Sequence, residues 1–113
     1  MSENTQDKFT NYTEFWPYYL REHSVSATRA LHYLGTSLAL LSIALGMFTE
    51  PAWLLAAPFM GYGFAWFAHF FVEHNKPATL TYPAWSLYSD FRMFGLWLIG
   101  RLKPHLEAAG VNH

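Results

Sequence analysis

The chain has 113 residues, of which 52% are hydrophobic, 19% aromatic and 13% charged. The charged share is about half of the roughly 25% that is usual for soluble globular proteins. A formal net charge of −1 offers no general attraction for nucleic acid, so we expect no nucleic-acid partner. No cysteine is present, which excludes disulfides and thiolate chemistry and leaves only nitrogen and oxygen ligands for any metal.

The length suits a single domain over residues 1–113, with polar tails expected at about 1–8 and 104–113. The first residues, MSENTQDKFTNYTEF, lack the basic and apolar regions of a secretory signal, so we expect a cytoplasmic start. Residues 9–22 form an aromatic-rich amphipathic segment. The following HSVSATRAL predicts a break and then a helix from near Ala27, because Ser24 or Ser26 can cap it.

Two uncharged runs, residues 33–49 and 51–72, are separated by Glu50. Their lengths of about 17 and 22 residues match the roughly 17–25 that a helix needs to cross a bilayer. We predict an all-α membrane protein with a transmembrane helical hairpin at about residues 31–49 and 51–72 and flanking amphipathic helices. A buried core of a soluble bundle is the alternative.

All seven Lys and Arg residues lie outside the hairpin, and its turn has none. The positive-inside rule then predicts cytoplasmic termini, and a bacterial inner membrane is the expected location. The third apolar stretch, residues 85–99, is interrupted by Asp90 and Arg92. We predict that it forms an amphipathic or interfacial helix between Pro83 and Gly100.

The hairpin would bring histidines that are distant in the sequence to one membrane face. His32 begins the first run, His69 lies near the end of the second, and His23 lies just upstream. His69 and Glu73 at i, i+4 are about 40° apart on a helix and can point at one ligand. His23 and His32 are nine residues apart, so they share a site only if the helix breaks between them.

Imidazoles with a carboxylate suit iron(II) and oxygen chemistry, and a zinc hydrolase would use a similar set. The spacing alone does not decide between a metal site and a structural role. A histidine on an apolar helix is more often a packing residue than a ligand, and Glu73 could pair with Lys76 or Arg29. Ionisable groups at a membrane are costly to keep, which favours a functional role for His69 and Glu73 together.

Two stretches, FWPYYLREHSVSATRALHYLG and WFAHFFVEHNKPATLTYPAWSLYSDFRM, flank most of the hairpin. With it they resemble the 2-hydroxy fatty acid dioxygenase family over roughly residues 9–103. The family pattern has two histidines nine residues apart, then a histidine with a glutamate four residues on, and Pro-Ala soon after. These positions are His23, His32, His69, Glu73 and Pro77-Ala78.

The resemblance implies an integral membrane, iron(II)-dependent dioxygenase of fatty acid α-oxidation that shortens a 2-hydroxy fatty acid by one carbon. Its partners would be a fatty-acid-like substrate, O2 and membrane lipid. Separately, a two-helix hairpin is small enough that we expect it to pack against a second copy of the chain, although the oligomeric state stays open. Glu73 and Asp90 are the expected catalytic residues, and Arg29 and Arg92 the expected substrate-binding ones. The implied metal ligands are His23, His32, His69 and Glu73, where Glu73 either binds the metal or orients an imidazole.

Two other classes of function stay open at this point. One is a non-catalytic small membrane protein for lipid binding or assembly, in which the histidines bridge helices. The other is a zinc-dependent membrane hydrolase with Glu73 as general base. Metal analysis separates the first from the dioxygenase, and oxygen uptake separates the second.

Overall fold

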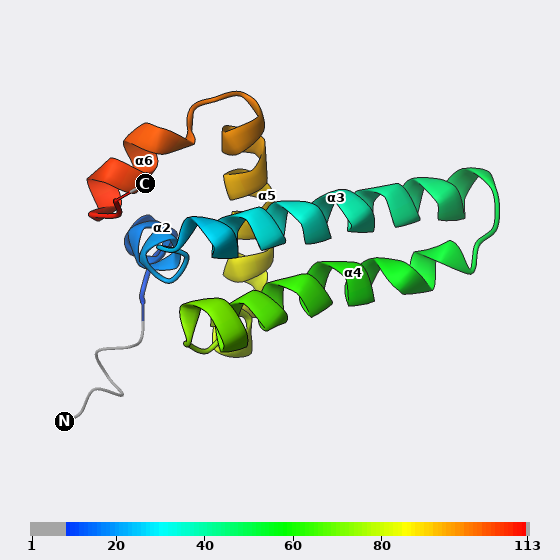
Figure 1. The fold of residues 1–113 in the computed structure, drawn as a ribbon, viewed down its shortest axis with the longest axis horizontal. Coiled ribbons are helices and arrows are strands. Elements are labelled where there is room, and N and C mark those ends of the chain that lie inside the picture. Colours follow the sequence, from blue (N-terminus) through cyan, green and yellow to red (C-terminus); the bar gives the residue numbers. More distant parts are fainter. Residues whose placement is uncertain (1–8, 113) are drawn as a thin grey trace.

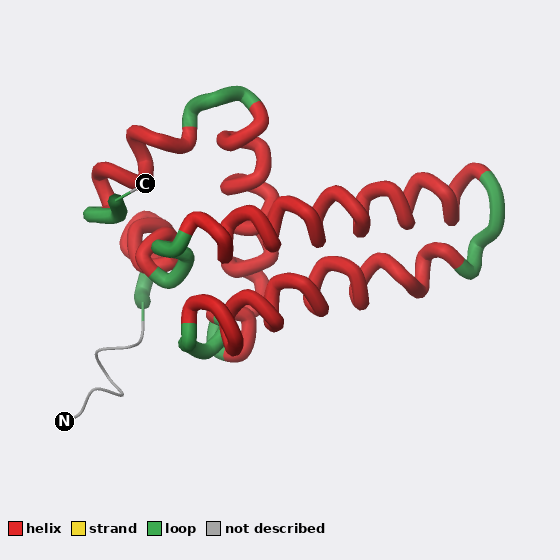
Figure 2. Tube along the Cα trace, in the orientation of Figure 1, coloured by secondary structure: helices red, strands yellow, loops and turns green. Residues whose placement is uncertain are grey.

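The structure is a computed structural model that describes residues 9–112, and these residues are predominantly helical. A long hairpin projects from a smaller group of helices (Figure 1). Loops are found at the turn of the hairpin and around the helices at its opposite end (Figure 2). The elements are α2 (Tyr12–Arg21), α3 (Ser26–Phe48), α4 (Trp53–Ala68), η1 (His69–Glu73), η2 (Ala78–Leu80), α5 (Pro83–Leu98) and α6 (Leu102–Ala109).

The hairpin of α3 and α4 confirms the predicted one, and α3 begins at Ser26, within one residue of the helix start expected near Ala27 and five residues before the expected membrane-spanning part. Two stretches, Ser26–Phe48 and Trp53–Glu73, are long and apolar enough to cross a membrane, and only 33% and 22% of their apolar windows are buried within the chain. Phe48 at the turn is 82% exposed, and Phe59 on the second turn of α4 is 77% exposed. Exposed apolar surface of this kind is unfavourable in water, so these faces suit lipid.

Glycine lets the two hairpin helices approach closely at two points. A Cβ on Gly35 would lie 2.9 Å from the Met60 carbonyl oxygen and 3.0 Å from the Phe64 Cβ. A Cβ on Gly46 would lie 2.5 Å from the Leu54 Cγ. Small residues at such contacts are the usual way for membrane helices to gain packing, because lipid offers no hydrophobic drive for helix association.

Aromatic side chains fill the interior between α2 and α5. Phe15 and Tyr19 of α2 and Met93 of α5 are almost fully buried. The Phe15 ring lies 5.4 Å from Trp85 and 5.2 Å from Tyr82, measured between centroids. Both predicted amphipathic segments are therefore helices, and they pack against each other beside the hairpin.

The C-terminal region differs from the polar tail that was expected over 104–113. Residues 102–109 form α6, which packs on α2 and buries Leu106 and Ala109. The indole Nε1 of Trp16 donates to His105 Nδ1 at 3.1 Å. The apolar positions of this helix recur at i, i+4 and i+7, a short amphipathic pattern that its charged residues obscured. The other expected tail, residues 1–8, lies outside the described residues.

Candidate metal centre

The predicted break between His23 and His32 is present, in the connection between α2 and α3. His23 lies in this connection and His32 lies on the second turn of α3. The reversal of the chain brings the two imidazoles together, with 3.0 Å between their Nε2 atoms. A continuous helix would have placed them on opposite sides.

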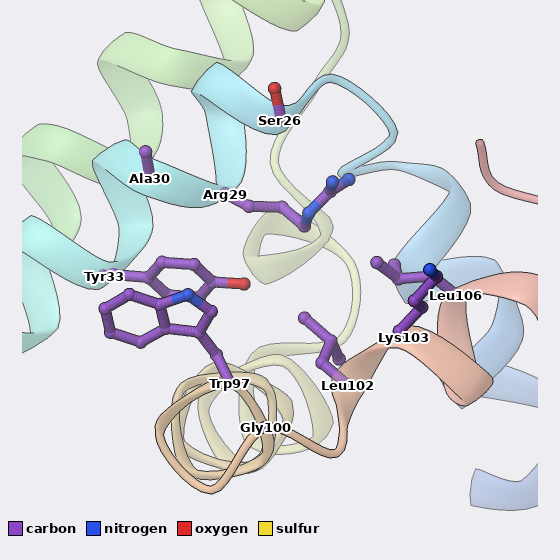
Figure 3. Close-up of a pocket in the computed structure, with 9 residues that line it drawn as sticks. All are labelled: Ser26, Arg29, Ala30, Tyr33, Trp97, Gly100, Leu102, Lys103 and Leu106. Atoms are coloured by element: carbon purple, nitrogen blue, oxygen red, sulfur yellow. The ribbon is translucent and has the colours of Figure 1, made fainter. Parts of the chain in front are cut away.

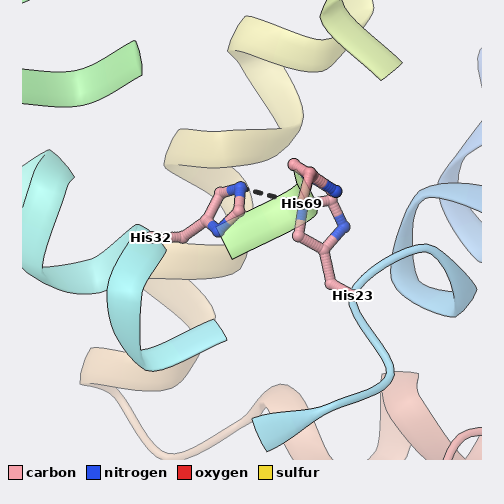
Figure 4. A group of neighbouring side chains, drawn as sticks. All are labelled: His23, His32 and His69. Carbon is pink, nitrogen blue, oxygen red and sulfur yellow. Dashed lines mark hydrogen bonds between the residues drawn. The ribbon is translucent and has the colours of Figure 1, made fainter. Parts of the chain in front are cut away.

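The third histidine, His69, comes from the end of α4. Its Nε2 lies 3.1 Å from that of His23, and one ligand nitrogen from each histidine lies within 4.8 Å of the others. His23, His32 and His69 are 1%, 4% and 2% exposed, so the cluster is shielded from solvent. Figure 4 shows the three imidazoles gathered where α3, the start of η1 and the preceding connection meet.

The other ring nitrogen of each histidine faces an oxygen that can only accept a hydrogen bond. His23 Nδ1 donates to the Tyr19 carbonyl at 2.6 Å, and His32 Nδ1 donates to the Thr28 carbonyl at 2.8 Å. His69 Nδ1 donates to Asn75 Oδ1 at 2.6 Å. The proton therefore sits on Nδ1 in all three rings, and three Nε2 lone pairs face one another.

Three converging lone pairs repel unless a cation lies between them, so the donor set fits a metal ion. Burial, followed by the neighbouring His32 and His69, lowers the pKa of His23 well below its ordinary value. A neutral imidazole is the form that binds metal. Orientation of each ligand by a hydrogen bond from its other nitrogen is typical of protein metal sites.

A cavity of about 290 Å³ begins at His32 and runs between α3, α4 and α5. Its polar lining residues include His32 at one end and Asp90 of α5, while most of the rest are apolar or small, such as Ile43, Ala57 and Phe91. The Tyr19 hydroxyl donates to Asp90 Oδ1. Burial raises the pKa of Asp90 to about 7. The cavity thus joins a polar end at His32 and Asp90 to an apolar channel along the hairpin.

Comparison with known protein families shows to which family the chain belongs. The family model described as 2-hydroxy-palmitic acid dioxygenase Mpo1-like matches residues 9–102. The chain belongs to this Mpo1-like family. No match is found among curated proteins or among solved structures. The match confirms the resemblance and spans the three histidines, the cavity and all of α2–α5.

Glu73 lies beside the histidines in this Mpo1-like chain, but its carboxylate faces the start of α3. Oε2 accepts from the Ser24 hydroxyl at 2.6 Å and from the Ser24 N–H at 3.2 Å, and Oε1 accepts from the Val25 N–H at 3.1 Å. Among the described residues, the group that could hold a metal contains the three histidines and not Glu73. The expected serine cap is wrong, because the N-cap is Val25 and makes no side-chain cap bond.

Asn75 is the site residue that the sequence did not single out. The last turn of α4 widens into the π-helical η1, and the Asn75 N–H donates to the His69 carbonyl at 2.8 Å. Asn75 Nδ2 donates to the Glu22 carbonyl at 3.1 Å, which fixes Oδ1 toward His69. His74, which precedes Asn75 in the sequence, is exposed and has a left-handed φ of 63°. A polar amide directly after a histidine-bearing helix was the available signal, and π-turns are frequent at functional sites.

The two arginines expected to bind substrate do not line the cavity that reaches His32. Arg29 Nη1 donates to the carbonyls of His23 and Ser24, at 2.8 and 3.1 Å. The Arg92 guanidinium lies over the Trp16 ring, 4.2 Å from its centroid, in a cation–π contact. Arg29 thus supports the connection that carries His23, and Arg92 stabilises the contact between α5 and α2.

Proposed function

We propose that the chain is a non-haem iron(II) dioxygenase that acts on 2-hydroxy fatty acids and shortens them by one carbon. The observation that carries the proposal is the convergence of three Nε2 lone pairs beside an apolar cavity, which one of the three ligands, His32, lines. Membership of the Mpo1-like family supports this activity and this substrate class. We further propose an integral membrane protein with both termini on the cytoplasmic side of a bacterial inner membrane.

His23, His32 and His69 would hold iron(II) through Nε2, and three protein ligands leave coordination positions open for reaction. Iron(II) bound there would supply the redox chemistry by which O2 reacts with the substrate. The residues of the chain bind and shield the substrate. Apolar walls such as Ile43 and Phe91 suit an acyl chain, and their position between the helices keeps water away from it.

Asp90 is the candidate for contact with the polar head of the substrate. The Tyr19 hydroxyl holds one of its carboxyl oxygens, and the residue lines the same cavity as His32. With a pKa of about 7, Asp90 is protonated in a large fraction of molecules near neutral pH. It can therefore either donate to the 2-hydroxyl group or accept from it. For Glu73 we propose a positioning role, in which it holds Ser24 and Val25 beside the metal ligands.

The proposed function is tested by anaerobic purification in detergent without a histidine tag, followed by elemental analysis and oxygen uptake. We expect near-stoichiometric iron, and uptake with a 2-hydroxy long-chain fatty acid but not with the unsubstituted acid. His69→Ala should lose the iron, whereas His74→Ala should keep it, because His74 is exposed and outside the cluster.

Two results would overturn the proposed function. Stoichiometric iron in folded His69→Ala protein would remove the ligand assignment. Stoichiometric zinc without substrate-dependent oxygen uptake would favour the hydrolase, since hydrolysis consumes no oxygen.

A further inference from the structure

A second cavity, of about 410 Å³, lies between the first turns of α3 and the region where α5 leads into α6 (Figure 3). It shares no lining residue with the cavity that reaches His32. Arg29 and Lys103 give it two cationic groups, and Tyr33 and Trp97 give it an aromatic wall. The metal centre makes no use of this space.

Arg29 is a buried cation whose hydrogen bonds within the described residues go to neutral groups. The residue is only 5% exposed, and its Nη1 donates to two neutral backbone carbonyls, those of His23 and Ser24. Buried charges in proteins are nearly always paired, because removal of a guanidinium from water carries a large free-energy penalty. An anion in the adjoining cavity would provide the missing partner.

Tyr33 gives an independent indication of a ligand. The residue is 8% exposed, and its hydroxyl oxygen lies beside the Arg29 guanidinium, from which it can only accept. The Tyr33 O–H itself has no acceptor in the part of the chain that the structure describes. Figure 3 shows this hydroxyl directed into the cavity below the Arg29 side chain, whose guanidinium turns toward the connection before α3. Buried hydroxyl groups are rarely left unbonded, so an acceptor bound in the cavity would satisfy this one.

The remaining walls suit an apolar tail. The Tyr33 and Trp97 rings stack with 4.3 Å between centroids and 12° between planes. Leu102 and Leu106 line the side formed by α6, while Lys103 is exposed at the rim. Cationic and hydroxyl donors beside aromatic and aliphatic walls are complementary to an anionic amphiphile.

We propose that this cavity binds the anionic head group of a membrane amphiphile, a carboxylate or a phosphate ester. Arg29, Lys103 and the Tyr33 hydroxyl would contact the head, and the first part of the tail would lie against Trp97. A free fatty acid and an acidic phospholipid share this chemistry. The site does not depend on bound metal or on the proposed function.

The binding test is a fluorescence titration of the full-length protein in non-ionic detergent with brominated lipids, which quench nearby tryptophans. The probes are dibromostearate, dibromo-phosphatidylglycerol and dibromo-phosphatidylcholine, and Trp97→Phe identifies the share of quenching that belongs to Trp97. We expect saturable quenching of Trp97 by at least one anionic probe, with phosphatidylcholine about tenfold weaker or worse.

Point variants locate the head group. Tyr33→Phe and Lys103→Gln should each weaken binding by about tenfold, as expected for the loss of one hydrogen bond to a charged group. Arg101→Gln is the matched control, because Arg101 is an exposed cation near the cavity that does not line it. Tyr33→Phe removes only the hydroxyl and leaves the backbone bonds of Arg29 intact, so it tests the site without loss of the fold.

The outcomes separate the two sources of the head group. Binding of dibromostearate alone identifies a carboxylate, binding of phosphatidylglycerol alone identifies a phosphate ester, and either supports the site. Equal quenching by phosphatidylglycerol and phosphatidylcholine, with Tyr33→Phe and Lys103→Gln unchanged, would overturn it. Iron content and oxygen uptake, measured on the same samples, show separately whether the proposed function fails.

Discussion

Two of the three histidines are oriented by a hydrogen bond to a backbone carbonyl. The third is oriented by a hydrogen bond to a side chain, which a substitution can remove. His23 and His32 each donate to the backbone carbonyl four residues earlier, which any residue at that position would provide. His69 donates to the side-chain oxygen of Asn75. Asn75 is therefore the position at which ligand orientation can be tested without a change to any ligand.

Asn75→Ala should weaken metal binding by about 10- to 100-fold, the usual effect of losing the partner of a metal-binding histidine. Asn75→Asp should weaken it less, because Asp keeps an oxygen for His69 Nδ1 while losing the Nδ2 bonds to Glu22. Competition with a chelator of known affinity measures both. Equal losses in the two variants would show that Asn75 acts through Glu22 and not through His69.

Asp90 makes stability depend on pH in a predictable direction. Burial raises its pKa from 3.8 in the unfolded chain to about 7, so the folded state holds a proton that the unfolded state has lost. Between about pH 4 and pH 7 the folded state binds more protons, and the free energy of unfolding therefore falls as pH rises. The slope for one group is at most about 1.4 kcal/mol per pH unit.

Thermal unfolding of wild type and Asp90→Asn in detergent isolates this contribution, because the histidines titrate in both proteins. Wild type should lose stability relative to Asp90→Asn as pH rises from 4 to 7, and the difference should level off above that range. A difference that stays constant with pH would mean that Asp90 is ionised throughout.

At the level of elements, the start of α3 depends on Glu73, which lies about fifty residues later in the sequence, after the second helix of the hairpin. Glu73→Gln keeps an oxygen acceptor for this helix end but loses its charge, and we expect a loss of stability of about 1 kcal/mol. If Glu73 positions the His23 connection, the variant should still bind iron stoichiometrically. A folded Glu73→Gln protein without iron would instead identify Glu73 as a metal ligand.

Close packing of α3 on α4 predicts contrasting effects for two glycines. Gly35→Ala should destabilise the hairpin by about 1–3 kcal/mol, because the new Cβ would meet the backbone oxygen of Met60 and force the helices apart. Gly63→Ala should be neutral or slightly stabilising, since a Cβ there meets no atom within 4 Å and Ala is the better helix former. Unfolding in detergent compares the two, and equal effects would show that helix propensity alone decides them.

The elements that could be predicted from the sequence are those whose signal is local. Charge-free runs predicted the hairpin, and the HSVSATRAL stretch predicted the break before α3. The Glu73 contact with Ser24 could not be predicted, because it joins residues that are far apart in the sequence. The hydrogen bond from His69 to Asn75 could not be predicted either, because it depends on the π-helical turn after α4. The helix α6 was missed because its apolar face becomes evident only once α2 is there to cover it.

On the scale of the whole molecule, α3 contributes to the walls of two separate cavities whose lining residues differ in chemical character. On one side His32 and Asp90 meet an apolar channel, and on the other Arg29 and Lys103 meet an aromatic wall. The polar ends of both cavities lie toward the end of the hairpin away from its turn, whereas the apolar part of the first runs along the hairpin to Ile43 and Ala57. A membrane boundary at this end would let polar heads reach both cavities while tails stay in lipid, which requires the turn to lie across the bilayer.

Membrane orientation can be tested directly because the chain has no cysteine. Glu50→Cys places a thiol in the hairpin turn, and Arg101→Cys places one between α5 and α6. If α3 and α4 span the bilayer, a membrane-impermeant maleimide should label the two positions from opposite sides of sealed vesicles, with Arg101→Cys on the cytoplasmic side. Labelling of both from the same side would mean that the hairpin lies along the membrane surface. Its exposed apolar residues would then contact the interfacial region of the bilayer and not its hydrocarbon core.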